Sequence, residues 1–538
     1  MRLPSLPTSM SRRIIAAAAG TLAAAIAMTG CSSSGQTASS SSGSAGTATF
    51  GGTLTMDIPA DEGCVDPQQN LGRTQLVIGR ALADSLVWED PSTGKFVPWL
   101  ASSWTESPDG KAYTFTLRKN VTFSDGSALN AQTVKDNLDA IVALGAHAPV
   151  ASSYLTTYTG ATVVSPMTVR VSFSAPDPSF LQALSTPSMG ILSDASTKRS
   201  QSKLCQGDFA GSGPFTLASY IQNASQTLTR RPGYNWAPAG LHGGGAYVDA
   251  VDVSVVPESS TRAGAVVSGQ SDIEMEVQKA DLPTLDAGEI SIAAKPNPGL
   301  PQQLYVNPGR GPLTDPVVRQ ALEIAINRPL LVSATLNKYE KVATSALAST
   351  TPGYTDLKSY LAFDPAKAAQ MLQQDGWVAG PGGIRVKNGQ KLSLTLLYGT
   401  ELYGFAVPLM ELIQSEYKSI GVELTLDPQP LATANADWAQ RNYELQLSGL
   451  TRGDPDVLRT AYYGESPALD KLLTQEATTV STTQRMKVVA EAEKYILQQA
   501  FAIPINENTL PVAYASNVKN VTFTADSLLL LYNVSLAQ

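Results

Sequence analysis

The stretch Asn297-Pro-Gly-Leu-Pro-Gln-Gln303 leads the chain out of an N-terminal region, and Phe501-Ala-Ile-Pro-Ile-Asn506 leads it back. Two crossings of this kind indicate two lobes joined by two strands. Ligands commonly bind between such lobes, and hinge closure traps them. The segments on either side of the crossings therefore decide the class of fold.

On the N-terminal side, strand patterns alternate with helix patterns. Gly52-Thr-Leu-Thr-Met-Asp-Ile58 alternates apolar and polar residues and predicts an opening strand. Pro108-Asp-Gly110 separates two further alternating runs and predicts a hairpin, and a second hairpin is expected across Ser165-Pro166. Between them, one helical face carries four apolar residues: Val134, Leu138, Ile141 and Val142.

On the C-terminal side, Asp364-Pro365 opens a helix that Gly376 closes. An acidic N-cap, a proline in the first turn and a glycine just past the end are the expected asymmetry of a helix. Strands at 392–397 and 422–426 enclose a helix at 407–419. The class is therefore α/β with antiparallel additions.

The first thirty residues have the layout of a secretory signal. Arg2, Arg12 and Arg13 supply positive charge, 14–28 is apolar, and Thr29-Gly30-Cys31 follows. The apolar segment is shorter than the roughly 20 residues of a membrane-spanning helix, although an uncleaved anchor is the alternative. We expect residues 1–30 to be a signal peptide.

Thr29-Gly30-Cys31 resembles the bacterial lipobox. The resemblance implies that a lipid is added to the Cys31 thiol and that the chain is cut before it, which would anchor the protein to the outer face of the cell membrane. Residues 31–50 are rich in Ser and Gly and predict a flexible tether.

Composition restricts the class of protein further. The chain has 538 residues and a net charge of −8, which becomes about −11 once the signal peptide is removed. At roughly 100–200 residues per domain, two to four domains are expected. No basic patch is visible, which argues against nucleic acid as a partner.

The three cysteines suggest one lipidated residue and one pair. If Cys31 carries lipid, Cys64 and Cys205 remain. An even pair outside the cytoplasm predicts a disulfide, and two buried free thiols are the alternative.

Many short motifs match one family in order. The matching segments are Leu86-Val-Trp-Glu-Asp90, Phe96-Val-Pro-Trp-Leu-Ala-Ser-Ser-Trp104, Ser107-Pro-Asp-Gly110, Tyr113-Thr-Phe-Thr-Leu-Arg118, Val121-Thr-Phe-Ser-Asp-Gly126, Thr133-Val-Lys-Asp136, Gly211-Ser-Gly-Pro-Phe215, Arg230-Arg-Pro-Gly-Tyr234, Pro316-Val-Val-Arg-Gln-Ala-Leu322, Asp364-Pro-Ala-Lys-Ala368 and Ile420-Gly-Val422. On these segments the chain resembles the extracytoplasmic solute-binding proteins of family 5, the peptide and nickel receptors of ABC importers.

The resemblance implies the type II periplasmic-binding fold, with two lobes and an extra subdomain in the first lobe. We expect the first-lobe core to use 51–92, 197–300 and 505–538, the extra subdomain to be 93–196, and the second lobe to be 301–504.

The implied function is that of a lipid-anchored, monomeric receptor. It captures a small solute, in the first instance an oligopeptide, and delivers it to an ABC permease whose ATPase subunits supply the energy. No cofactor is implied. A second hypothesis keeps the fold but changes the ligand to nickel, another metal complex or an oligosaccharide.

Asp454 is the first candidate for contact with ligand. In peptide-binding members, an aspartate in a segment like Asp-Tyr-x-Asp-Pro contacts the ligand's ammonium group. The corresponding segment here, Thr451-Arg-Gly-Asp-Pro-Asp-Val-Leu-Arg459, is shorter, so Asp454 and Asp456 compete for the role. A turn or N-cap aspartate is the alternative. Arg452 and Arg459 either meet a ligand carboxylate or form structural pairs.

Several aromatic residues are candidate linings of the cleft, with ordinary packing as the alternative for each. They are Trp438, Tyr403, Tyr305, Tyr462 and Tyr463. Asn307 matches an asparagine that the family carries after the first crossing, and we expect it to make structural hydrogen bonds.

The sequence contains few of the motifs that are typical of an enzyme. A secreted hydrolase is a third hypothesis. The chain contains two histidines, His147 and His242, but no Gly-x-Ser-x-Gly motif that would present a nucleophilic serine to either of them. No HExxH motif or cysteine cluster offers zinc ligands, and no phosphate-binding loop is present. We therefore predict no catalytic residue and no metal site.

Overall fold

The computed structural model describes residues 49–70, 72–400 and 406–537. The predicted signal peptide, Cys31, most of the tether and Tyr403 lie outside these residues. None of the helices in the described part of the chain combines the length and apolar character needed to cross a bilayer.

Lobe 1 is built on a seven-stranded sheet with β1 (Thr53–Ile58) near its centre. The predicted opening strand is confirmed. Leu54, Met56 and Ile58 are fully buried, and β1 pairs in parallel with two neighbours. The order is β12 (Ser291–Ala293), β22 (Val512–Tyr514), β11 (Ile273–Met275), β1, β10 (Ala250–Val255), β9 (Ser225–Arg230) and β8 (Phe215–Ile221).

A second, four-stranded sheet packs on the same hydrophobic core. Its order is β4 (Ala101–Glu106), β5 (Ala112–Leu117), β7 (Thr168–Phe173) and β6 (Tyr158–Ser165). Both predicted hairpins are confirmed, as β4–β5 and β6–β7. Around the two sheets lie α1 (Arg73–Leu82), α2 (Ala131–Leu144), α3 (Pro149–Ser153), α4 (Phe180–Ala183), α5 (Gln201–Cys205), α6 (Ser259–Val267) and α7 (Leu282–Ala287).

Helix α2 begins where Asn130 accepts hydrogen bonds from the backbone of Gln132 and Thr133. The predicted buried face is wrong at one position. Val142 is 46% exposed, whereas Ile141 is fully buried. Adjacent helical residues are separated by about 100°, so the residue after Ile141 turns toward solvent.

Lobe 2 contains a six-stranded sheet of mixed direction. Its order is β14 (Lys341–Val342), β21 (Ala502–Glu507), β13 (Gly299–Val306), β20 (Leu445–Thr451), β18 (Ser393–Gly399) and β19 (Glu423–Gln429). The predicted strands at 392–397 and 422–426 are confirmed as β18 and β19, which pair in parallel.

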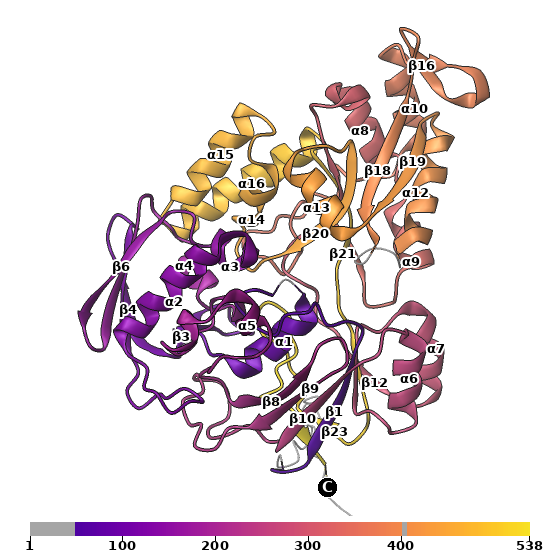
Figure 1. Ribbon diagram of the computed structural model, residues 1–538. Coiled ribbons are helices and arrows are strands. Elements are labelled where there is room, and N and C mark those ends of the chain that lie inside the picture. The colour runs from indigo at the N-terminus through magenta and orange to yellow at the C-terminus, as the bar shows by residue number, and fades with distance from the viewer. Residues whose placement is uncertain (1–48, 71, 401–405, 538) are drawn as a thin grey trace, which may run out of the picture. The chain divides into compact units, whose positions relative to one another are not determined.

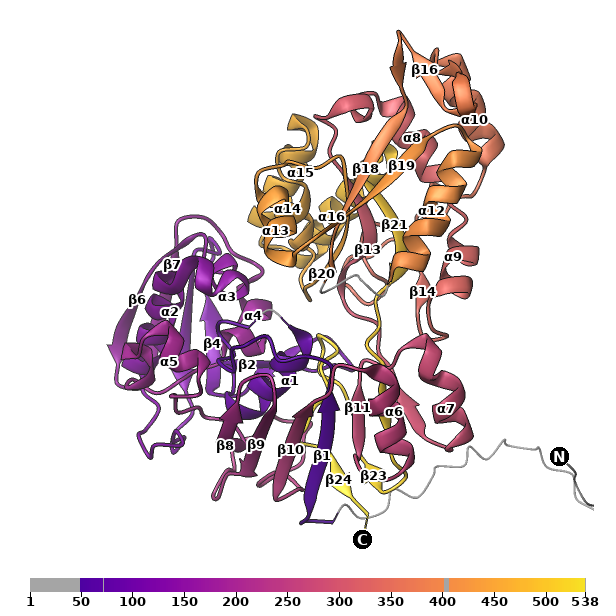
Figure 2. The same cartoon turned by 45° about the vertical axis from the view of Figure 1, so that its right-hand side comes forward.

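Helices cover both faces of this sheet (Figures 1 and 2). One face packs against a core shared with α8 (Pro316–Ile324), α9 (Arg328–Thr335), α10 (Pro365–Gln374) and α12 (Val407–Ser419). The other packs against α13 (Leu431–Ala439), α14 (Val457–Tyr462), α15 (Pro467–Thr478) and α16 (Thr482–Gln498). Asp364 caps α10 by accepting from the backbone of Lys367, as the sequence predicts.

The two predicted crossings are neighbouring antiparallel strands. Leu304 of β13 pairs with Ile503 of β21, and every residue of both strands is buried. Consecutive strand residues point to opposite faces, so complete burial requires cover on both sides of the sheet.

Small sheets and one disulfide complete the described chain. The short strands are β2 (Val87–Glu89) with β3 (Phe96–Pro98), β15 (Val378–Ala379) with β16 (Arg385–Lys387) and β17 (Gln390–Lys391), and β23 (Val518–Lys519) with β24 (Ser535–Leu536). The disulfide joins Cys64 to Cys205, as the sequence predicts. Beside it, the backbone N–H of Val65 donates to the carbonyl of Cys205 at 3.1 Å.

Candidate functional site

A cavity of about 220 Å³ is lined by residues of both lobes. Lobe 1 contributes residues within 153–157 and 175–179, and lobe 2 contributes residues within 452–463 and 474–485. We call it the interlobe pocket. Its charged lining consists of Asp177, Arg452, Asp454, Asp456, Arg459 and Arg485.

The loop between β20 and α14 carries three of these charges, and Arg459 follows in α14. β20 ends at Thr451, and α14 begins at Val457. Asp454 Oδ1 accepts the backbone N–H of Asp456 at 2.8 Å, and the backbone N–H of Val457 donates to the carbonyl of Asp454. An aspartate before proline readily makes such a turn. The turn that the sequence offered as an alternative for Asp454 is therefore present.

Asp454 is also bound by a buried arginine. Arg485 Nη1 donates to Oδ2 at 2.8 Å, and Nη2 donates to Oδ1 at 2.5 Å. The same guanidinium lies 2.5 Å from Glu476 Oε1. All three side chains are less than 10% exposed. Burial, together with repulsion from Asp456 and Asp454, raises the pKa of Glu476 to about 8, although Arg485 opposes the shift.

Asp456 binds a different arginine. Arg459 donates from Nε to Oδ1 at 2.6 Å and from Nη2 to Oδ2 at 2.7 Å. This bidentate pair spans three residues at the start of α14. Asp456 occupies the N-cap position, but its side chain makes no cap hydrogen bond. Both aspartates therefore line the pocket while each is paired with an arginine.

Arg452 joins the two lobes. Its Nη2 donates to Ser153 Oγ at 2.7 Å, and its guanidinium lies 4.6 Å from the centre of the Tyr154 ring. Within lobe 2, Nη1 donates to Thr460 Oγ1 at 3.0 Å. The alternative of a structural pairing for Arg452 thus has contacts to support it.

Asp177 faces the same pocket from lobe 1. Burial raises its pKa to about 6, with Asp456 and Asp454 adding repulsion, and the Ser179 hydroxyl donating to it lowers the pKa. Sequence reasoning missed Asp177. Its local signal, an aspartate between two prolines, predicts a turn and gives no sign of residues that lie far along the chain.

Glu89, at the end of β2, is a second missed carboxyl group. It is half-buried. Burial, followed by repulsion from Asp526 and Asp454, raises its pKa to about 8, whereas Lys295 and a hydrogen bond from Ser185 lower it. Charges of both lobes therefore act on this carboxyl.

The aromatic candidates separate into two groups. Tyr305 packs edge-on against Trp438 at 4.4 Å and beside Tyr462 at 5.9 Å, within a hydrophobic core of lobe 2. These three rings are outside the lining of the interlobe pocket, whereas Tyr463 is part of it and is 58% exposed. Tyr403 lies outside the described residues.

Asn307 makes the structural hydrogen bonds that the sequence predicts. Its Nδ2 donates to the carbonyls of Arg441 and Tyr443 at 2.9 and 3.0 Å, and its Oδ1 accepts the N–H of Gly309. In the part of the chain that the structure describes, no three His, Cys, Asp or Glu side chains gather to hold a metal ion.

Comparison with known proteins gives a consistent result. Residues 95–469 match the family model of bacterial extracellular solute-binding proteins, family 5 Middle. The glutathione-binding protein GsiB of Escherichia coli (strain K12) is 24% identical over 458 residues, covering 80% of this chain and 84% of the relative. The nickel-binding periplasmic protein of the same strain is 25% identical over 479 residues, covering 82% and 87%.

Solved structures share the fold. NikA from Brucella suis in complex with Fe(III)-EDTA superposes with a TM-score of 0.78 at 23% identity, covering 90% of this chain and 100% of NikA. DppA from Helicobacter pylori in complex with the peptide STSA gives 0.76 at 22% identity, covering 91% and 99%. These likenesses confirm the predicted two-lobed, type II periplasmic-binding fold. The relatives named here are binding proteins.

Proposed function

We propose that this chain, which belongs to the family 5 bacterial extracellular solute-binding proteins of ABC importers, captures peptides between its two lobes and delivers them to a membrane permease. Members of this family work with permease and ATPase subunits. A receptor of this kind needs no catalytic group. It needs closure that is stabilised by contacts made to the ligand in the closed state.

The observation that supports a peptide is the charge of the interlobe pocket. Its lining contains three arginines and three aspartates. A peptide with free ends carries an ammonium and a carboxylate, which such a lining can pair. Arg485 donates one hydrogen bond to each oxygen of Asp454, and the backbone N–H of Asp456 donates a further one to Oδ1. Because a carboxylate offers about four acceptor sites, Asp454 can still accept a ligand ammonium.

The anchor is part of the same proposal. A lipid on Cys31 and a tether through residue 50 would keep the receptor close to its permease. Replacement of Cys31 with Ala should release the protein from cells into the medium. Unchanged retention at the membrane would contradict the anchor without affecting the proposal for the ligand.

Nickel or a metal complex is the second candidate ligand. The observation in its favour is the similarity to the E. coli nickel-binding protein over 82% of this chain. A thermal-shift screen separates the two candidates. Short peptides with free ends should raise the melting temperature, whereas nickel, nickel chelates and oligosaccharides should not. A response to a nickel chelate alone would overturn the peptide proposal.

N-acetylated peptides sharpen the screen. Acetylation removes the ammonium charge that Asp454 is proposed to bind, so affinity should fall about tenfold or more. Asp454→Asn should bind free and acetylated peptides alike. Asp356→Asn, at an exposed aspartate of lobe 2, is the matched control and should keep the preference for the free ammonium. Equal binding of both peptides by the unmodified protein would contradict the role of Asp454.

A further inference from the structure

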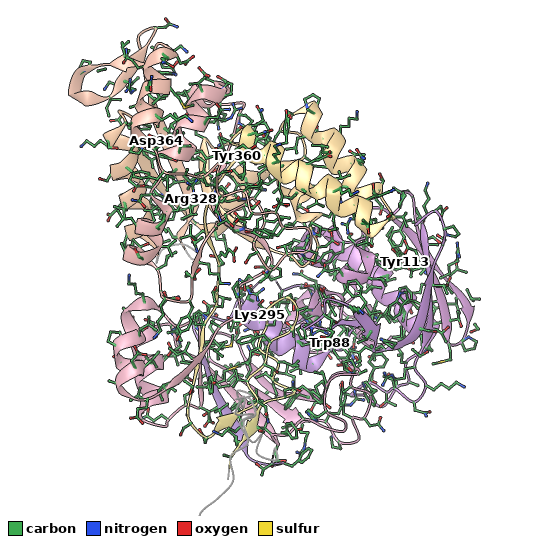
Figure 3. The ribbon with its side chains drawn as sticks, turned by 180° about the vertical axis from the view of Figure 1, so that it is seen from behind. Trp88, Tyr113, Lys295, Arg328, Tyr360 and Asp364 are labelled. Carbon is green, nitrogen blue, oxygen red and sulfur yellow. A yellow bond between two sulfur atoms is a disulfide. The ribbon has the colours of Figure 1, made fainter. Side chains whose placement is uncertain are left out.

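A second cavity, of about 530 Å³, lies within lobe 2. Its walls come from α8, residues 359–364, α10 and the end of α16, and it shares no lining residue with the interlobe pocket. We call it the lobe 2 pocket. Figure 3 shows Tyr360 and Asp364, which line it, close to Arg328.

Glu323 is the exceptional residue in this lining. It is 3% exposed, and its Oε1 is buried with no hydrogen-bond partner among the described residues. A buried polar atom without a partner costs folding free energy, and native proteins almost always satisfy such atoms with protein groups, water or a ligand. Because Glu323 belongs to a pocket wall, a ligand can supply the missing donor.

The surroundings of Glu323 favour a cation with an apolar body. Ile324 and Met371 line the same pocket, are half-buried and offer aliphatic surface. Tyr360 adds an aromatic ring, whose hydroxyl accepts a hydrogen bond from Gln498 at 3.1 Å. Aromatic faces attract cations, and aliphatic chains gain free energy by leaving water. A bare metal ion would instead need several oxygen ligands.

We propose that the lobe 2 pocket binds a small organic ammonium ion, whose N–H donates to the Glu323 carboxylate while its hydrocarbon chain packs on Ile324 and Met371. This site is separate from the solute site between the lobes. A primary alkylammonium satisfies the acceptor that the protein leaves without a donor, and it adds a charge-assisted hydrogen bond.

Binding should be coupled to loss of a proton. Burial raises the pKa of Glu323 well above its ordinary value, and the charge of Arg328 on α9 opposes this. The other ionisable groups around it are Tyr417 on α12 and, in the pocket lining, Asp364 and Lys367 at the start of α10. A bound ammonium adds a positive charge that stabilises the ionised carboxylate. The carboxyl proton is then released to the buffer.

Titration calorimetry with n-butylammonium chloride tests the proposal. The protein should bind n-butylammonium but not butyrate, and the heat should change between buffers of different protonation enthalpy. In Glu323→Gln the affinity should fall about tenfold or more. Glu491→Gln, at an exposed glutamate of α16, is the matched control and should bind as the unmodified protein does.

A second variant keeps the test decisive if Glu323→Gln folds poorly. Lys367 is an exposed cation in the pocket lining, so Lys367→Gln should tighten n-butylammonium binding several-fold. Unchanged binding in Glu323→Gln, or preferred binding of butyrate, would overturn the proposal. Asp454→Asn should leave n-butylammonium binding to the lobe 2 pocket unaltered. The test of the lobe 2 pocket is therefore independent of which solute the interlobe pocket captures.

Discussion

Asp454 has two hydrogen-bonding partners, and the local sequence predicts only one of them. Its turn with Asp456 is local, and an Asp-Pro pair predicts it. Its ion pair with Arg485 joins residues 31 positions apart, from the loop after β20 to the start of α16. The charge of Asp454 therefore neutralises a buried arginine, whatever its role toward ligand.

Asp454→Asn should lower stability. The substitution leaves Arg485 with Glu476 as its remaining partner in the ion-pair cluster. Removing one partner of a buried ion pair costs about 3–5 kcal/mol, and the remaining contact of Arg485 with Glu476 places Asp454→Asn at the lower end of this range. Urea unfolding should show a loss of about 3 kcal/mol in the free energy of unfolding.

The control for this measurement is Asp356→Asn. Asp356 pairs with Lys358 on the surface, where both side chains are largely exposed. Exposed pairs contribute little to stability because water and salt screen them. If the two variants lose the same free energy of unfolding, the buried Asp454–Arg485 pair does not stabilise the fold more than an exposed pair does.

At the scale of helices and strands, local sequence patterns predicted the bounds and caps of several helices. The helix at 407–419 has the predicted bounds, and α10 begins after the predicted cap at Asp364. Gly376 has φ +91°, a conformation open to glycine, just past the end of α10. Val142 was misplaced because neighbouring helical residues point in different directions, which only the observed burial resolves.

The disulfide connects two elements that the sequence separates widely. It joins the segment after β1 to the last residue of α5, with a separation of 141 residues. Closing a loop of this length in the unfolded chain corresponds to about 4–5 kcal/mol as an upper value. The double variant Cys64→Ser/Cys205→Ser should therefore lose several kcal/mol in guanidinium unfolding.

Reduction of the unmodified protein provides the control for the cysteine variant. Reduced wild-type protein and the double serine variant should unfold at similar denaturant concentrations, because both lack the cross-link. A variant as stable as the oxidised protein would instead support the alternative of two free thiols.

At the scale of the whole molecule, Arg452 connects the lobes. It donates to Ser153 and stacks on Tyr154, both in lobe 1. A hydrogen bond and a cation–π contact together contribute about 1–2 kcal/mol. Arg452→Ala should therefore shift the balance between closed and open forms about tenfold toward the open form.

Small-angle scattering can measure that shift as an increase in the radius of gyration of the ligand-free protein. Arg441→Ala is a suitable control because Arg441 pairs with Glu465 within lobe 2. A larger radius in both variants, or in neither, would show that the contacts of Arg452 do not hold the lobes together.

The sequence by itself determined the α/β class, the two crossings, the hairpins, the disulfide partners and the family. These features depend on alternation, turn residues and motif order, which are visible over short stretches. Only the tertiary structure decided which partner each charged or aromatic residue takes. Arg452 meets Ser153 across 299 positions of chain, and Tyr305 packs against Trp438 in the core of lobe 2. Such pairings depend on how whole elements pack together, and the spacing of residues along the chain does not determine that packing.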